Sequence, residues 1–181
     1  GRSSAASDVY KRQVLTIPQQ KVWLVFRNYH LDWQGQELTQ ILKRVQQWEN
    51  AGNHIQGIQI DFDAKTKHIH QYALFLSQLR EQLPQHYQLS ITGLMDWTNV
   101  TNQETLNLLN KTIDELVIQT YQGSTTLPNY AAYLKKVSAL KLPYKIGIVQ
   151  YGQWRRLPKL ENDTNFKGYV VFLLRSKPQN N

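Results

Sequence analysis

The chain has 181 residues, 41% of them hydrophobic, which is room for one globular domain with a sizeable core. It contains no Cys, so disulfides, thiolate catalysis and cysteine-bound metals are excluded. The net charge is +8, but Lys and Arg are scattered, which favours a solvated surface over a nucleic-acid groove. No apolar run reaches the roughly 18 residues of a membrane span. We therefore expect neither nucleic acid nor a membrane crossing in this sequence.

The first residues do not read as native protein. Residues 8–13 match one reading frame of a transposon-end adapter used in sequencing libraries, and residues 1–7 have the low complexity of its flank. We therefore expect 1–13 to be a non-native segment on a metagenomic fragment, and 14–181 to be one domain. On this interpretation the natural protein begins before Val14. Any export signal, to a bacterial periplasm or cell envelope, would lie in that missing part.

Six short apolar runs recur along the chain and are rich in Val, Ile, Leu, Tyr and Phe. They are Val22–Arg27, Ile55–Asp61, Tyr87–Gly93, Glu115–Tyr121, Tyr144–Gln150 and Gly168–Leu174. Near-continuous apolar runs are typical of strands buried on both faces. Amphipathic patterns between them predict helices. These are Gln36–Asn50, Lys67–Leu83, Asn102–Lys111 and Asn129–Ser138.

The alternation of strand and helix is typical of parallel βαβ units, and both a doubly wound sheet and a barrel fit it. No Gly-x-Gly-x-x-Gly turn occurs, which disfavours a dinucleotide-binding domain. Polar and aromatic residues follow several strands, and a barrel places its active site at the carboxyl ends of its strands. The sequence therefore predicts an α/β fold, namely an incomplete TIM (β/α)8 barrel with six parallel strands and intervening helices.

Two carboxylates stand at the end of the second apolar run. Because side chains alternate along a strand, Gly57, Gln59, Asp61 and Asp63 share one face. Polar groups that face a barrel interior are costly unless they are paired or used. Two carboxylates with Cα atoms about 6.5–7 Å apart should split their protonation, and a proton donor to a glycosidic oxygen needs the neutral form. This argument predicts Asp61 and Asp63 as the catalytic pair and leaves open which of the two is the acid.

Two other interpretations of this pair stay open. It can be a structural pair that closes the loop before the helix Lys67–Leu83. It can also be the metal-binding Asp-x-Asp of a sugar transferase, although no nucleotide-binding pattern accompanies it. His68 and His70 lie two apart on a helix and face different directions, so they make a poor metal pair. We expect no cofactor and no metal.

Side chains at the other strand ends extend the predicted site. The chain has 5 Trp and 10 Tyr, and such aromatics line either sugar sites or the core. A hydrogen-bonding, aromatic-lined cleft suits a carbohydrate, so we predict glycan hydrolysis, with a non-catalytic carbohydrate-binding or cell-envelope barrel as the alternative. The predicted substrate-binding residues are Gln59, Gln119, Tyr121, Gln150, Tyr151, Trp154, Arg27, Asp96 and Trp97.

Four segments carry a resemblance to a known family. They are Gly57–Ala64, Leu89–Leu94, Asp114–Gly123 and Pro143–Trp154. In these segments the chain resembles a bacterial family known only as a domain of unknown function (number 3142), which is grouped with glycoside-hydrolase barrels. The resemblance covers nearly everything after residue 20.

A more distant resemblance is to chitinase-type hydrolases, whose fourth strand ends Asp-Gly-x-Asp-x-Asp-x-Glu with the last Glu as general acid. It implies that Asp63 stands at the acid position and Asp61 at the supporting carboxylate. It also implies that Ile55–Asp61 is the fourth strand of a barrel. The six runs are then strands three to eight, and strands one and two lie in the missing N-terminal region.

Later segments extend the likeness to chitinase-type hydrolases. Tyr121 matches the Tyr that helps to position the N-acetyl group of the substrate, and Tyr151-Gly152 with Trp154 is similar to their seventh-strand pattern. The chain also departs from their pattern. Gln56 and Gln59 replace the first two Asp residues, Asp63 replaces Glu, and Gln122 stands where an Asp is expected.

Overall fold

The structure of the protein is a computed structural model, which describes residues 14–100, 102–122 and 125–172. The predicted non-native segment 1–13 lies outside the described residues, as do residues 173–174 at the end of the last predicted strand. None of the helices in the described part of the chain combines the length and the apolar composition that a membrane crossing requires.

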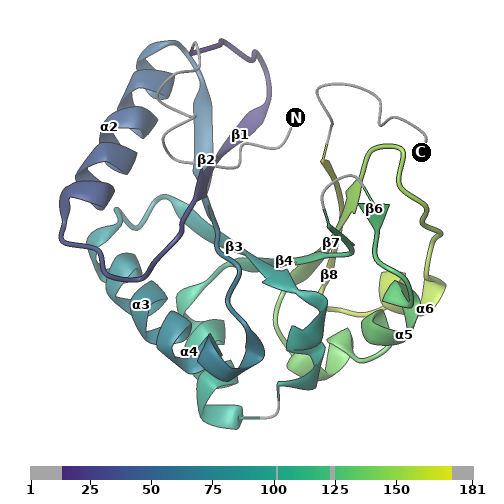
Figure 1. Ribbon diagram of the computed structural model, residues 1–181. Coiled ribbons are helices and arrows are strands. Elements are labelled where there is room, and N and C mark those ends of the chain that lie inside the picture. Colours follow the sequence, from purple (N-terminus) through teal and green to yellow (C-terminus); the bar gives the residue numbers. More distant parts are fainter. Residues whose placement is uncertain (1–13, 101, 123–124, 173–181) are drawn as a thin grey trace.

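Six parallel strands form the main sheet. They are β1 (Lys21–Arg27), β2 (His54–Asp61), β3 (Gln88–Leu94), β4 (Glu115–Gln119), β7 (Tyr144–Val149) and β8 (Phe166–Phe172). Their order in the sheet follows the sequence without reversal. A doubly wound sheet reverses its order at a switch point, so the topology is that of a barrel. The sheet curls with helices on its outer side (Figure 1). The predicted incomplete α/β barrel is confirmed.

The helices lie close to the predicted positions. They are α2 (Gln36–Asn50), α3 (Ile69–Gln82), α4 (Gln103–Thr112), α5 (Tyr130–Leu134) and α6 (Pro158–Glu161), with 3-10 helices at Thr66–His68, Met95–Asn99 and Val137–Leu140. The first predicted helix is confirmed at both ends. The side chain of Asn102 caps α4 by accepting a hydrogen bond from the backbone N–H of Thr105. The predicted helix Asn129–Ser138 is instead two short helices.

The fourth strand ends earlier than its apolar run. The predicted strand Glu115–Tyr121 stops at Gln119, and Tyr121–Gln122 forms a separate strand, β5, which pairs antiparallel with β6 (Thr125–Thr126). Thr120 lies at the break. Its carbonyl accepts a hydrogen bond from Leu127 N at 2.7 Å instead of continuing the ladder. The reason is therefore a tertiary contact, which the apolar pattern does not encode.

The two faces of the sheet differ in character. The main core lies on the outer face, where strand residues such as Leu24, Ile60 and Ile118 pack against the helices. Because side chains alternate, the residues between them face inward. The inner face carries a small apolar cluster of Val117, Tyr121, Val149 and Phe172, with polar side chains beside it. Of the predicted site residues, Gln59, Asp61 and Gln119 lie on this inner face, because each stands next to a strand residue of the outer core.

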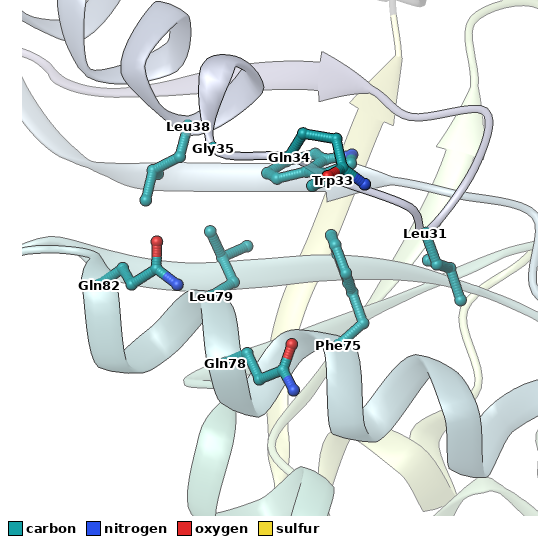
Figure 2. Close-up of a pocket in the computed structure, with 9 residues that line it drawn as sticks. All are labelled: Leu31, Trp33, Gln34, Gly35, Leu38, Phe75, Gln78, Leu79 and Gln82. Carbon is teal, nitrogen blue, oxygen red and sulfur yellow. The ribbon is translucent and has the colours of Figure 1, made fainter.

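The helices on the outer side of the sheet leave a cavity between two of them. Helix α3 packs along α4. A cavity of about 380 Å³ lies between α3 and the start of α2, and side chains from both sides point into it (Figure 2).

Gly57 on β2 is in register with Gln88 on β3. A Cβ at position 57 would lie 2.1 Å from the carbonyl oxygen of Gln88, which is backbone and has little room to move. We expect Gly57→Ala to lower the free energy of unfolding by about 3 kcal/mol. Gly147→Ala is the graded control, because its Cβ would meet side-chain atoms of Val117 and Phe172 at 3.0 and 3.1 Å. It should cost about 1 kcal/mol, and equal losses in denaturant melts would contradict the argument.

Candidate functional site

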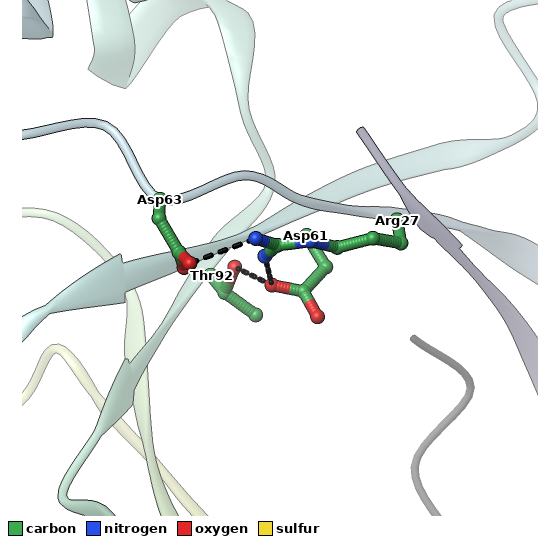
Figure 3. A network of polar contacts seen from close by, with 4 residues as sticks. All are labelled: Arg27, Asp61, Asp63 and Thr92. Carbon is green, nitrogen blue, oxygen red and sulfur yellow. Dashed lines mark hydrogen bonds and ion pairs between the residues drawn. The ribbon is translucent and has the colours of Figure 1, made fainter. Parts of the chain in front are cut away.

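A guanidinium lies between the two predicted catalytic carboxylates (Figure 3). Arg27 Nη2 contacts Asp63 Oδ2 at 2.8 Å, and Arg27 Nη1 contacts Asp61 Oδ1 at 3.2 Å. Arg27 reaches both because β1 and β2 pair in parallel, with Arg27 directly opposite Asp61. Three of the predicted site residues therefore form one cluster at the carboxyl ends of two strands, which we call the strand-end cluster.

The two carboxylates of the strand-end cluster differ in accessibility. The side chain of Asp61 is fully buried, whereas that of Asp63 is 52% exposed. Asp61 is the last residue of β2, and Asp63 lies in the loop that follows. Thr92 on β3 donates a hydrogen bond to Asp61 Oδ1 at 3.0 Å. Asp61 is therefore held from two neighbouring strands, while Asp63 presents its carboxylate to solvent.

The charges of the cluster act on its neighbours. The hydrogen bond to Asp63 raises the pKa of Arg27, and the negative charges of both carboxylates add to the rise, against the lowering effect of burial. Tyr72 on α3 is fully buried near the cluster. Burial is the main cause of the raised pKa of Tyr72, and the negative charges of Asp61 and Asp63 raise this pKa further. The phenol therefore stays protonated.

Sequence reasoning missed Thr92 and Tyr72 as members of this region. Thr92 alternates with apolar residues on β3, so its inward position could have been inferred from the same face rule as for Asp61. Tyr72 belongs to the apolar stripe of a predicted helix, and nothing local distinguishes it from an ordinary core residue. Only the packing of α3 under the end of β2 brings it near the carboxylates.

Asp96 and Trp97 hold the loop that carries Asp63. The indole N–H of Trp97 donates to Ala64 O at 2.8 Å, and Asp96 Oδ2 accepts a hydrogen bond from the hydroxyl of Thr66 at 2.8 Å. Trp97 is 1% exposed and packs edge-on against the ring of Tyr72. Trp97 is therefore occupied in holding the loop after Asp63 and in packing against Tyr72.

Gln59, Gln119 and Tyr121 lie on the inner face of the sheet. Gln59 Oε1 accepts a hydrogen bond from Ser90 Oγ at 3.2 Å, and the ring of Tyr121 packs against that of Phe172. Both Gln side chains are more than nine-tenths buried, and the structure provides no hydrogen-bond partner for either Nε2 atom among the described residues. The inner face therefore has two buried amide donors without a partner among the described residues.

Gln150, Tyr151 and Trp154 lie in the loop after β7. The backbone N–H of Gln150 donates to Phe172 O at 2.9 Å, and Tyr151 has a positive φ of 67°. The side chains of Tyr151 and Trp154 are 59% and 39% exposed. The Trp154 ring packs against Tyr169 with centroids 5.0 Å apart. These three residues follow β7, whereas the strand-end cluster lies at the carboxyl ends of β1 and β2.

A carboxylate anchors the ring that supports Trp154. Glu161 accepts a two-point ion pair from Arg156, at 2.9 and 2.6 Å, and a hydrogen bond from the hydroxyl of Tyr169 at 2.8 Å. The hydrogen bond from Arg156, followed by that from Tyr169, lowers the pKa of Glu161 to about 2.

This low pKa predicts how the loop responds to acid. A carboxylate whose pKa is lowered in the folded state stabilises the fold at pH values above the usual carboxyl range. This stabilisation is lost as the pH falls through the lowered pKa. We expect the Glu161 carboxyl to titrate near pH 2, and the indole signal of Trp154 to shift in the same range. An NMR titration against Glu161→Gln measures both. A Glu161 carboxyl that titrates in the usual carboxyl range, or a Trp154 signal that shifts equally in Glu161→Gln, would contradict the anchoring role.

The potential metal ligands of this chain are the side chains of His, Asp and Glu. Among the described residues, His, Asp and Glu side chains form no group of three or more that could hold a metal ion. His70 Nδ1 lies 2.9 Å from the hydroxyl of Thr105 and so belongs to the contact between α3 and α4.

These features define a class, namely an open parallel (β/α) barrel with a buried and an exposed carboxylate at its strand ends. The chain belongs to the family described as "Domain of unknown function (DUF3142)", whose model matches residues 29–126. The predicted family is confirmed over these residues, which include three of the four sequence segments, and Pro143–Trp154 lies outside the matched range.

Comparison with solved structures gives a partial likeness. The chain is similar to the crystal structure of the Bacillus cereus spore cortex-lytic enzyme SleL, at 20% identity and a TM-score of 0.47. The likeness covers 72% of this chain and 36% of that chain, so the chain spans about a third of its length. We draw no functional argument from it. No curated protein matches the chain.

Proposed function

We propose that the strand-end cluster is the catalytic centre of a glycan hydrolase, with Asp63 as proton donor and Asp61 as its supporting carboxylate. The observation that carries the proposal is the pairing of an exposed Asp63 with a fully buried Asp61 at the carboxyl ends of parallel strands. Barrel enzymes use this edge for catalysis. An exposed carboxyl group can reach a glycosidic oxygen, and the buried one supplies a fixed negative charge.

Arg27 gives the proposal a specific first step. A guanidinium at 2.8 Å favours the charged form of a carboxyl group, whereas proton donation needs the neutral form. We therefore propose that bound substrate displaces Arg27 from Asp63, and that the freed carboxyl group then takes up its proton. Arg27 stays bound to Asp61 while it leaves Asp63, because Asp61 is buried and is itself fixed by the hydrogen bond from Thr92.

The inner face offers groups for the sugar itself. The amide nitrogens of Gln59 and Gln119 are buried donors without a partner among the described residues, and a substrate oxygen would satisfy them if it displaced the groups that cover them. Tyr121, on the same side as Val149 and Phe172, adds an aromatic wall. Tyr151 and Trp154 supply an exposed rim for neighbouring sugar units, and the half-buried Gln150 lies next to Tyr151 in the chain.

The ion pairs also favour the alternative of a non-catalytic carbohydrate-binding barrel. If Arg27 never leaves Asp63, both carboxylates stay charged, and the cluster only ties β1 to β2. A metal-dependent sugar transferase is less favoured, because the space between the carboxylates already holds a cation, the Arg27 guanidinium.

One set of assays separates these functions. The full chain is incubated with a panel of soluble and insoluble glycans, and new reducing ends are measured beside binding. Hydrolysis of any glycan supports the proposal. Binding without new reducing ends supports the non-catalytic barrel, and metal-dependent binding of a nucleotide sugar by calorimetry supports the transferase.

A further inference from the structure

The cavity between α2 and α3 lies away from the strand-end cluster, on the helical side of the sheet (Figure 2). Its walls come from the loop before α2, the first turn of α2, and one face of α3. The α3 wall consists of Phe75, Gln78, Leu79 and Gln82, at the spacing of neighbours on one helix face. A volume of about 380 Å³ falls in the range of small-molecule pockets.

The cavity has an apolar floor with a fixed aromatic ring. Leu38 and Leu79 are buried at its base. The Trp33 indole N–H donates to Asn28 Oδ1 at 3.0 Å, and its ring packs edge-on against Phe75 with centroids 4.9 Å apart. Trp33 is therefore held in one orientation. Trp33 and Phe75 are the aromatic side chains of the lining.

The polar groups of the cavity are all uncharged amides. Gln34, Gln78 and Gln82 line it, and none of its lining residues is ionisable, although 19% of the chain is charged. All three Gln residues are exposed, and no hydrogen bond of their side-chain amides to another described residue is seen. Each amide can both donate and accept a hydrogen bond.

This lining selects for one class of ligand. A charged ligand would lose water and find no counter-charge in the walls. A wholly apolar ligand would leave the amides without partners. Sugar hydroxyls both donate and accept, as the amides do, and the C–H face of a sugar ring fits an aromatic floor. We infer that the cavity between α2 and α3 is a second binding site, which takes an uncharged sugar unit of a glycan.

The inference goes beyond the proposed function, because it assigns binding to another surface and needs no catalysis. A glycan chain held on the helical side would keep the protein near its polymer. Only binding, however, is needed for the inference to hold.

The test is a calorimetric titration of the full chain with two uncharged trisaccharides, one of glucose and one of N-acetylglucosamine. Trigalacturonate, which carries carboxylates, is the charged comparison. The test variant is the double substitution Gln78→Leu with Gln82→Leu, which keeps size and removes the amides. Gln71→Leu is the matched control, because Gln71 is an exposed residue of the same helix outside the cavity.

We expect at least one uncharged trisaccharide to bind, and the double variant to weaken its binding about tenfold. Gln71→Leu should leave the binding unchanged, and trigalacturonate should bind at least about tenfold more weakly. Absence of binding, equal binding of trigalacturonate, or unchanged binding by the double variant would each overturn the inference. Loss of binding in Gln119→Leu alone would move the ligand to the inner face, which overturns the second site but leaves the proposed function standing.

Discussion

Replacing Asp63 by Asn should abolish glycan hydrolysis and leave the fold intact. The Asn amide keeps the shape of the side chain but has no acidic proton to transfer to the glycosidic oxygen. General acids contribute about 10²–10⁴-fold to the rate of such reactions. Because the Asp63 side chain is 52% exposed, little of the core depends on its charge. The measurement is the rate of reducing-end release from whichever glycan the wild type cleaves, together with calorimetric binding of the same glycan.

Two comparisons make the Asp63 result specific. Asp32→Asn is the matched control, since Asp32 is an exposed Asp in the loop before α2 and should retain full activity. Binding by Asp63→Asn should stay within a few-fold of wild type. If Asp63→Asn cleaves at the wild-type rate, Asp63 is not the acid, and the cluster is better explained as a structural tie.

The second large effect is expected from Arg27→Met. The substitution keeps most of the apolar stem but removes the guanidinium that contacts Asp61, whose side chain is fully buried. Removing one partner of a buried ion pair costs about 3–5 kcal/mol, because the remaining charge stays in a medium that solvates it poorly. For a chain of this size, that corresponds to a fall of roughly 6–20 °C in Tm. Denaturant unfolding followed by circular dichroism measures the loss.

A second substitution tests the reason for that loss. Arg27→Met combined with Asp61→Asn removes both charges and should recover much of the stability. Arg156→Met removes an exposed ion pair, 74% exposed on the Arg side, and should cost little. If Arg27→Met is as mild as Arg156→Met, the Asp61 carboxylate does not depend on Arg27.

The strands of the sheet and the two faces of each strand could be predicted from local sequence patterns. Each strand has a period of two, so placing Ile58 and Ile60 outward forces Gln59 and Asp61 inward. The structure buries both Ile side chains completely in the core on the helical side. Helix Gln36–Asn50 was equally accessible, because its apolar stripe and the flanking Gly35 and Gly52 mark both ends.

The contacts that the site residues make could not be predicted from local sequence patterns. The alternation rule puts Arg27 and Asp61 at strand ends but does not say that the two strands pair in register. It also presents Trp97 as a strand-end aromatic, whereas its indole N–H holds the loop after Asp63. The early end of β4 at Gln119 depends on the hydrogen bond between Thr120 and Leu127. Each of these contacts joins residues that are separate in the sequence.

By itself, the sequence determined the parallel strand-helix units and placed two carboxylates on one face of one strand. These features follow from periodicity, which each segment carries locally, whereas the unreversed strand order of an incomplete barrel is a property of the assembled sheet. Only the tertiary structure decided that Arg27 lies between Asp61 and Asp63, and that an uncharged cavity separates α2 from α3. Register and helix packing are set by contacts between distant segments, and no local pattern specifies them.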